Sequence, residues 1–368
     1  MPQPKVKKPK LAITIGEPGG IGPEVAVRAA ASREVRSVCD PILIGGALSV
    51  RMALDMLSLP FALREIEGPR ESRPEAGIIE FVPAGPPEGK SKKFKRGKPS
   101  AGGGMACYEY IKAAARAAME GEVKAICTAP ISKEALRMAG VAYPGHTEML
   151  AALTGTRKFA MMLMGGPLRV LLVTIHVALK DVPGLIKKEM VLEKILLASG
   201  AAEMLGIERP RIAVCGLNPH AGEAGLFGDE EAREIAPAVR QARKKGIDAS
   251  GPVSPDVLFR KAFTGEADIV VAMYHDQGLI PLKMIAFDRG VNVTVGLPII
   301  RTSPDHGTAY DIAWKGIADP ASMIEAARTA VSLSPRRACL SRPAGLSTGG
   351  YWSSSRGPGP RRSSRTSR

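Results

Sequence analysis

Paired cysteines, export signals and membrane-length apolar runs are missing from this sequence, and each absence excludes a class of protein. The 368 residues include 5 cysteines, which are odd in number, scattered and never arranged as CxxC. Such a set argues against a disulfide framework and against a thiolate zinc site, and it fits a reducing compartment. We therefore expect a cytoplasmic protein.

No stretch is apolar for long enough to span a membrane. The most apolar segment, residues 161–179, is broken by Pro167 and contains Arg169 and His176, whereas a spanning helix needs about 20 predominantly apolar residues. The first ten residues carry charge without the apolar core and cleavage pattern of a secretory signal. We expect no membrane partner.

Acidic residues are missing from both ends of the chain. Residues 334–368 hold eight arginines and residues 1–10 four lysines, so these ends carry most of the formal net charge of +15. A third basic cluster, residues 90–98, contains Phe94 as its single aromatic residue and so lacks the repeated aromatics of a base-stacking platform. We expect a solvated loop there, with a phosphate-attracting rim as the alternative, disordered ends, and no specific nucleic-acid partner.

The rest of the chain has ordinary globular proportions, with 45% apolar and 24% charged residues overall. Short aliphatic runs alternate with longer helical patterns, which predicts an α/β fold over residues 11–333. Helices are expected from about Pro23, into Leu57 and after Gly104. The length fits two domains or one large α/β unit with a subdomain, and we expect two α/β lobes around a central cleft. The predicted strands are 11–15, 42–46, 78–82, 125–130, 168–176, 211–216, 267–276 and 291–298.

Three histidines follow predicted strands. His176 and His275 lie at the ends of two predicted strands, and His220 comes shortly after a third. Ligands bind at the carboxyl edge of open α/β sheets, so these imidazoles can converge there and hold a divalent cation. Their separations match no short metal-binding pattern, and each alone is more often a structural histidine.

The loop after the first strand is rich in glycine but is not GxGxxG. Residues 16–24 read GEPGGIGPE, with Pro23 suited to the first turn of a helix. A tight turn and direct phosphate cradling both fit this loop. It therefore provides no Rossmann fingerprint for a dinucleotide.

Several polar residues interrupt an otherwise apolar segment near the end of the chain. Lys283, Asn292 and Arg301 form the combination that holds a phosphate or carboxylate, whereas Arg289 fits a surface charge. Residues 304–309 contain turn formers and lead into a predicted helix, as an N-cap or as a loop that brackets a ligand.

The chain contains, in this order, seven long motifs: GEPGGIGPE, GHTEML, VTIHVALKDVP, GLNPHAGEAGLFGDEE, GPVSPD, YHDQGLIPLK and TSPDHGTAYDIAWKG. Together they resemble the 4-hydroxythreonine-4-phosphate dehydrogenase family of vitamin B6 biosynthesis over residues 11–332. IGPE and HGTAxDIA also resemble the wider isocitrate and isopropylmalate dehydrogenase group, which binds NAD without a GxGxxG loop. This chain departs from the family pattern at Glu17 and Gly19, where the family usually has Asp and Ala, and in its arginine-rich tail.

The resemblance implies a homodimer of two-domain subunits whose interdomain active site is completed by the neighbouring subunit. It also implies NAD, with NADP as an alternative, and one divalent metal ion (Zn, Mg, Co or Mn) per site. The implied metal ligands are His176, His220 and His275. The implied substrate contacts are His146, Thr147, Lys283, Asn292 and Arg301. The implied cofactor segment is His306, Gly307, Thr308 and Ala309.

The expected reaction is oxidation of 4-phosphooxy-L-threonine at its C3 hydroxyl. The β-keto acid product would then lose its carboxylate to give 3-amino-2-oxopropyl phosphate. Asp256 and Asp276 are both candidate bases, or outer partners of a metal-binding histidine. The nearest alternative is a sister dehydrogenase of 4-phosphoerythronate or threonate. More distant ones are a basic nucleic-acid-binding protein and a catalytically inactive binding protein.

Overall fold

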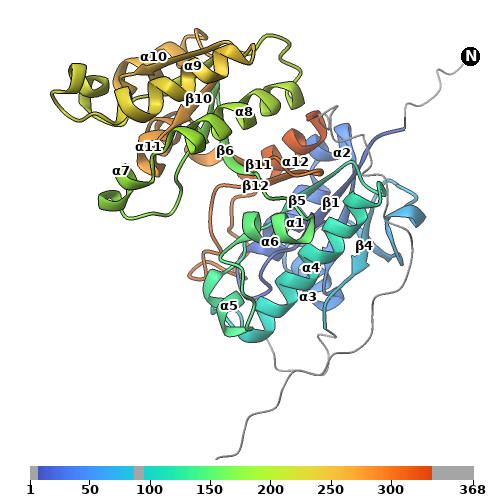
Figure 1. Cartoon of the computed structure of the whole chain (residues 1–368). Helices are drawn as coiled ribbons and strands as arrows, with labels where there is room; N and C mark the ends of the chain where they lie inside the picture. Colours follow the sequence, from blue (N-terminus) through green and yellow to red (C-terminus); the bar gives the residue numbers. More distant parts are fainter. Residues whose placement is uncertain (1–6, 87–94, 334–368) are drawn as a thin grey trace, which may run out of the picture. The chain divides into compact units, whose positions relative to one another are not determined.

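The computed structural model describes residues 7–86 and 95–333, and Figure 1 shows how their helices and strands are arranged. These residues belong to one compact unit. The predicted division of residues 11–333 into two lobes stays a prediction. The arginine-rich tail, residues 1–6 and part of the basic cluster at 90–98 lie outside the described residues.

Twelve strands in the described part form one sheet, in the order β3-β4-β2-β1-β5-β12-β11-β6-β7-β10-β8-β9. The six strands from β3 to β12 run parallel, β11 and β6 are antiparallel to their neighbours, and β7 to β9 are parallel again. The strands are β1 (Lys10–Thr14), β2 (Asp40–Gly45), β3 (Ala62–Glu65), β4 (Ile78–Pro83), β5 (Ala125–Thr128), β6 (Ala160–Gly165), β7 (Leu168–Leu172), β8 (Ile212–Cys215), β9 (Ala249–Val253), β10 (Ile269–Ala272), β11 (Val291–Val295) and β12 (Ile300–Pro304).

The central strands are aliphatic because both of their faces are covered. Every residue of β5 and β10 is buried, as expected for parallel strands between helical layers. α4 packs against β1, β2 and β5, α12 against β5, β11 and β12, α8 against β8 and β10, and α11 against β6 and β7. The α-helices are α1 (Gly22–Ala31), α2 (Arg33–Val38), α3 (Ala47–Met56), α4 (Ala101–Met119), α5 (Lys133–Met138), α6 (His146–Leu153), α7 (Val182–Leu185), α8 (Lys188–Met204), α9 (Ala236–Lys244), α10 (Pro255–Phe263), α11 (His275–Ala286) and α12 (Ala321–Ser332).

The structure confirms the α/β prediction, and each of the eight predicted runs contains a strand. Sequence reasoning missed β3, β6, β9 and β12 as separate strands. β7 ends at Leu172, so His176 lies on the loop beyond it rather than at the strand end. β1 begins at Lys10, inside the segment predicted to be disordered, and the Lys8 ammonium donates to the Arg36 carbonyl over 2.6 Å.

The helix predicted after Ala309 is wrong. Turns occupy residues 310–314 instead, and α12 begins at Ala321. Ala309 and Trp314 have φ values of 38° and 62°, which a right-handed helix does not allow. The buried Glu24 carboxylate of α1 holds this segment by accepting from the N–H groups of Trp314 and Gly316.

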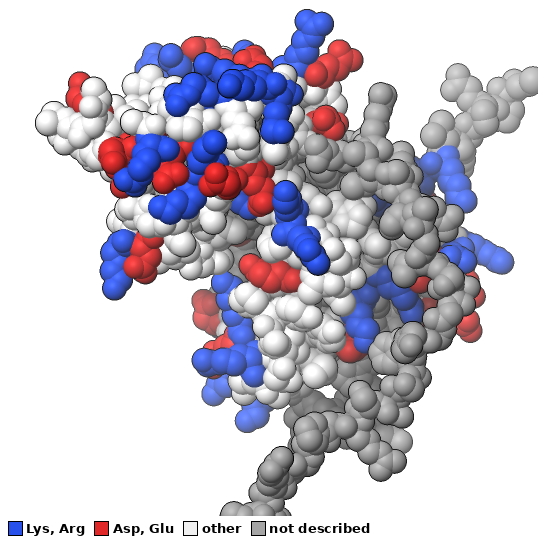
Figure 2. All heavy atoms as spheres, in the orientation of Figure 1, with Lys and Arg blue, Asp and Glu red and all other residues white. Residues whose placement is uncertain are grey.

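Charges of both signs are interspersed on the face of the molecule that Figure 2 shows. Arg211 and Asp268 pair at 3.0 Å, and Arg233 pairs with Asp229 at 2.9 Å. Over residues 7–86 and 95–333, no helix is both long and apolar enough to cross a membrane.

Candidate active site

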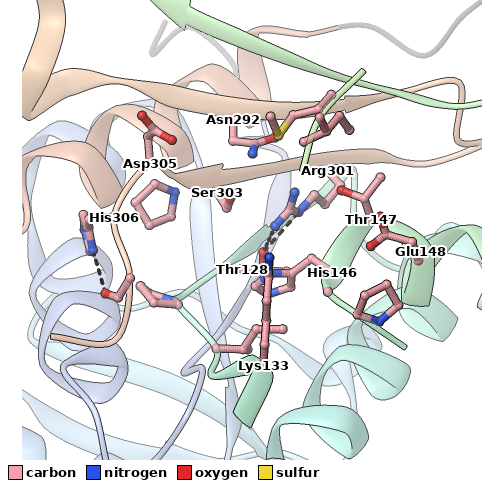
Figure 3. Close-up of a pocket in the computed structure, with 18 of the residues that line it drawn as sticks. Thr128, Lys133, His146, Thr147, Glu148, Asn292, Arg301, Ser303, Asp305 and His306 are labelled. Atoms are coloured by element: carbon pink, nitrogen blue, oxygen red, sulfur yellow. Dashed lines mark hydrogen bonds between the residues drawn. The ribbon is translucent and has the colours of Figure 1, made fainter. Parts of the chain in front are cut away.

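A cavity of about 350 Å³ lies where the carboxyl ends of β5 and β12 meet the start of α6. Residues of β6, β11 and the loop after β7 complete its wall. We call it the Arg301 pocket, and Figure 3 shows its polar side chains converging on a common space. The charged and polar residues that line it are Thr128, Lys133, His146, Thr147, Glu148, His176, Asn292, Arg301, Ser303, Asp305 and His306.

Arg301 is a charged residue whose side chain is almost completely buried, with 1% of its surface exposed. Its guanidinium donates to the Thr128 hydroxyl over 2.8 and 3.1 Å and to the Thr294 hydroxyl over 3.0 Å. No carboxylate of the described residues lies within 4.0 Å of it. Burial lowers the pKa of Arg301 to about 10, against the opposing influence of Cys127 and Glu148. A buried cation without a counter-ion is costly, and an anionic ligand would compensate its charge.

Three other predicted substrate contacts share this pocket. Asn292 faces Ser303 across the β11–β12 pair, and its Oδ1 atom is buried with no hydrogen-bond partner among the described residues. His146 begins α6, and its Nε2 atom is likewise buried and unpartnered in the described part. Burial and the Arg301 charge lower the pKa of His146 well below its usual range, which keeps the imidazole neutral. Thr147 follows on the same helix.

Lys283 is separated from the lining of this pocket. Its ammonium pairs with the Asp305 carboxylate at 3.3 Å and lies 5.9 Å from the centre of the Phe287 ring. Burial raises the pKa of Asp305, and Lys283 opposes that rise. Because Asp305 does line the pocket, Lys283 contacts the pocket wall through this ion pair.

The predicted cofactor segment is divided between the pocket and the glycine-rich loop. His306 and Gly307 line the pocket, whereas the Thr308 carbonyl accepts from the Ile21 N–H over 2.9 Å. A Cβ atom at Gly20 would lie 2.9 Å from the Cβ of Thr308, and one at Gly19 would lie 2.6 Å from the Lys95 carbonyl oxygen.

The whole loop over residues 16–24 is buried. Side chains in place of these glycines would collide with neighbouring parts of the chain. The glycines are therefore needed for packing, which favours a tight turn over direct phosphate cradling. Burial raises the pKa of Glu17 in this loop to about 7, against the lowering influence of Tyr310, Gly19 and Gly20.

Two of the three predicted metal-binding histidines lie side by side. His176 and His275 follow the adjacent parallel strands β7 and β10, and their ring centres are 5.8 Å apart. Burial and the charges of Lys133 and His275 lower the pKa of His176, with Glu148 opposing, so this imidazole is neutral and has a lone pair to donate. His275 Nδ1 lies 2.7 Å from the Asp276 carboxylate.

His220 belongs to a second cavity, lined also by both predicted bases, Asp256 and Asp276. We call it the His220 pocket. His220 lies in a left-handed stretch after β8, with a φ value of 51°. The Ser254 hydroxyl donates to Asp256 and lowers the pKa of that carboxyl. Within the described residues, no three His, Cys, Asp or Glu side chains are placed to hold a metal ion. One chain therefore assembles two of the three predicted ligands.

Comparison with known proteins decides the family. The family described as pyridoxal phosphate biosynthetic protein PdxA matches residues 37–330. The chain belongs to the PdxA family. This confirms the resemblance seen in the sequence motifs.

Close relatives of this PdxA-family chain are dehydrogenases. It is 48% identical to a 4-hydroxythreonine-4-phosphate dehydrogenase of Trichlorobacter lovleyi, over 90% of this chain and 99% of that protein. It is 47% identical to a D-threonate 4-phosphate dehydrogenase of Cupriavidus necator, over 90% and 98%. A crystal structure of 4-hydroxythreonine-4-phosphate dehydrogenase from Klebsiella pneumoniae is 42% identical, has a TM-score of 0.81, and covers 88% of this chain and 100% of its own. The chain is an oxidoreductase that acts on a CH–OH group.

Sequence reasoning missed several pocket residues of this PdxA-family chain. Thr128 ends β5, and Lys133 begins α5, with its ammonium 3.5 Å from His176 Nδ1. Glu148 and Asp305 lie inside the quoted motifs GHTEML and TSPDHGTAYDIAWKG. Their position within these motifs was the available signal.

Proposed function

We propose that this chain oxidises 4-phosphooxy-L-threonine at its C3 hydroxyl with NAD, or alternatively NADP, as hydride acceptor. The product, 2-amino-3-oxo-4-phosphooxybutanoate, then loses CO₂ to give 3-amino-2-oxopropyl phosphate in vitamin B6 biosynthesis. The observation that carries the proposal is Arg301, a buried cation that lines a cavity and has no carboxylate partner in the described part. A substrate phosphate would supply the missing negative charge.

The residues around Arg301 would orient this substrate. The Asn292 amide lies in the same wall and would donate to the phosphate. Lys283 would reach the same end if Asp305 released it from their ion pair. His146 and Thr147 would hold the amino-acid end, with the neutral His146 able to exchange a proton with the substrate. Such positioning accounts for much of the rate in enzymes of this kind.

We propose that His176 and His275 bind a divalent ion such as Zn²⁺, Co²⁺, Mn²⁺ or Mg²⁺, and that His220 of a second copy completes the site. A bound ion supplies Lewis acidity toward a hydroxyl or carbonyl oxygen. The adjacent imidazoles and the lowered pKa of His176 fit this role. Asp276, which holds His275, and Asp256 remain the two candidate bases. Residues 306–309 would contact the nicotinamide cofactor.

The homodimer is part of the proposal. Ile280 and Met284 of α11 and Phe287 just beyond it are 58%, 83% and 74% exposed. Ile280 and Met284, four residues apart, lie on one face of α11, and Phe287 follows after the helical geometry breaks at Ala286. Large exposed apolar surfaces mark interaction sites. α11 itself begins at His275, so a second copy seated on this helix would lie near a proposed metal ligand. Four buried free cysteines support a cytoplasmic location.

A second candidate substrate is D-threonate 4-phosphate, since a relative of similar identity acts on it by name. It carries the same phosphate and differs at C2, where a hydroxyl replaces the amine. A specific nucleic-acid partner is not proposed, because the face in Figure 2 mixes charges of both signs.

The test is reduced-cofactor formation by purified protein given 4-phosphooxy-L-threonine, NAD and a divalent metal. We expect turnover by the wild type, loss of turnover in EDTA, and loss in Arg301→Met. Arg289→Met, an exposed arginine outside the pocket, is the matched control and should keep full activity. Equal activity of Arg301→Met and the control would refute the proposed phosphate site.

A further inference from the structure

The Arg301 pocket contains two carboxylates, and they differ in what they contact. Asp305 pairs with Lys283 at 3.3 Å. Glu148 has no lysine, arginine or histidine nitrogen within 4.0 Å among the described residues, although it lines the cavity. Figure 3 places these two carboxylates on opposite sides of the pocket, with Glu148 beside Thr147.

Glu148 is also close enough to Arg301 to influence its charge. Burial is the main cause that lowers the pKa of Arg301, and the negative charge of Glu148, which lines the same cavity, acts against it. The pocket therefore contains the buried cation of Arg301, the ammonium of Lys133 and one unpaired carboxylate. This charge pattern is complementary to a zwitterionic ligand with a phosphate and an ammonium group.

We propose that Glu148 binds the C2 ammonium of the substrate and makes this chain selective for the amino acid phosphate over the hydroxy acid phosphate. The inference rests on the proposed function. In D-threonate 4-phosphate a C2 hydroxyl replaces the ammonium, so Glu148 would accept from a neutral hydroxyl instead of pairing with a cation. A hydrogen bond between two charged groups contributes more than one in which only the acceptor is charged, and we expect a preference of about tenfold to a hundredfold.

A purely structural role for Glu148 makes a different prediction. Glu148 is the acidic residue in the first turn of α6, where a negative charge stabilises a helix. A variant that lost only this contribution would lose activity equally toward both substrates. The ratio of the two activities therefore separates the two roles.

The experiment compares kcat/KM for 4-phosphooxy-L-threonine and D-threonate 4-phosphate in the wild type and in Glu148→Gln. We expect the variant to lose about tenfold to a hundredfold with the amino substrate, mainly in KM, and to change about threefold or less with the hydroxy acid. Glu148→Asp, which keeps the charge, should keep the preference. Glu134→Gln is the matched control, since Glu134 is an exposed first-turn acid of α5 outside the pocket.

Equal losses with both substrates in Glu148→Gln would overturn the inference, as would a wild type that prefers the hydroxy acid. A wild type inactive on both substrates would refute the proposed function instead. Calorimetric binding of the same two compounds would then decide the inference. Tighter binding of the amino compound that Glu148→Gln abolishes supports it, and equal binding of both compounds refutes it.

Discussion

Replacing Arg301 with methionine should stabilise the ligand-free protein while it removes anion binding. Arg301 is 1% exposed and has no carboxylate partner among the described residues. Its buried charge therefore costs stability whenever the anion is absent. Methionine fills similar space without a charge, so the two effects of the arginine can be separated in one variant.

The magnitude follows from the contacts of the guanidinium. Lowering its pKa from the ordinary value to about 10 corresponds to a cost of about 3 kcal/mol for the charged form. The cost is constant through neutral pH, because the folded and unfolded pKa values both lie above it, and it is relieved only as the pH rises past about 10. Losing the hydrogen bonds to the Thr128 and Thr294 hydroxyls costs about 2 kcal/mol in return. The expected net gain in the free energy of unfolding is about 1 kcal/mol.

The assay is denaturant unfolding of both proteins without ligand and with inorganic phosphate. We expect Arg301→Met to unfold at a higher denaturant concentration than the wild type when no ligand is present. Phosphate should stabilise the wild type and leave the variant unchanged. A ligand-free variant destabilised by more than about 2 kcal/mol would show that the guanidinium is a net stabilising contact, and the argument from an uncompensated charge would be refuted.

Three further predictions concern other parts of the chain. Glu17→Gln should raise the unfolding free energy by about 3 kcal/mol at high pH and by little at low pH, because burial raises the pKa of Glu17 to about 7 and ionisation then opposes folding. Unfolding free energies of the two proteins that change with pH in the same way would contradict this. Met284→Asp on the exposed face of α11 should yield a monomer by light scattering, and an intact dimer would exclude this face as the interface. Glu231 accepts from the Leu217 and Asn218 N–H groups, both over 2.7 Å, so Glu231→Gln should weaken metal binding by displacing His220; unchanged calorimetric affinity would argue against that.

Much of the fold is predictable from the aliphatic runs because the parallel strands are buried on both faces. The runs that contain β5 and β10 are continuous and unmistakable. β3 and β9 lack such a pattern because they are edge strands with partly exposed residues. The segment after Ala309 was misjudged because its shape is imposed by Glu24, almost 300 residues away in the sequence, and no local pattern reports such a contact.

The types of residue at the site could be predicted from the sequence, but which of these residues lie together could not. Adjacency of β7 and β10 brings His176 and His275 together, and that adjacency is a property of strand order rather than of spacing. Lys283 pairs with Asp305 and does not line the pocket that Arg301 lines, although all three residues lie within residues 283–305 of the sequence. Glu148 was not singled out because a single acid in a helical first turn has an ordinary structural explanation.

The buried cysteines offer a way to observe the two halves of the sheet separately. Cys39, Cys107 and Cys127 belong to the half that contains β1, β2 and β5, whereas Cys215 ends β8 in the other half. Burial raises the pKa of all four thiols, so an alkylating reagent modifies them only when the surrounding structure opens. In a Cys339→Ser variant, mass spectrometry of the modified peptides would measure the rate at which each half of the sheet opens. Equal rates at Cys127 and Cys215 would mean that the continuous sheet opens as one cooperative unit.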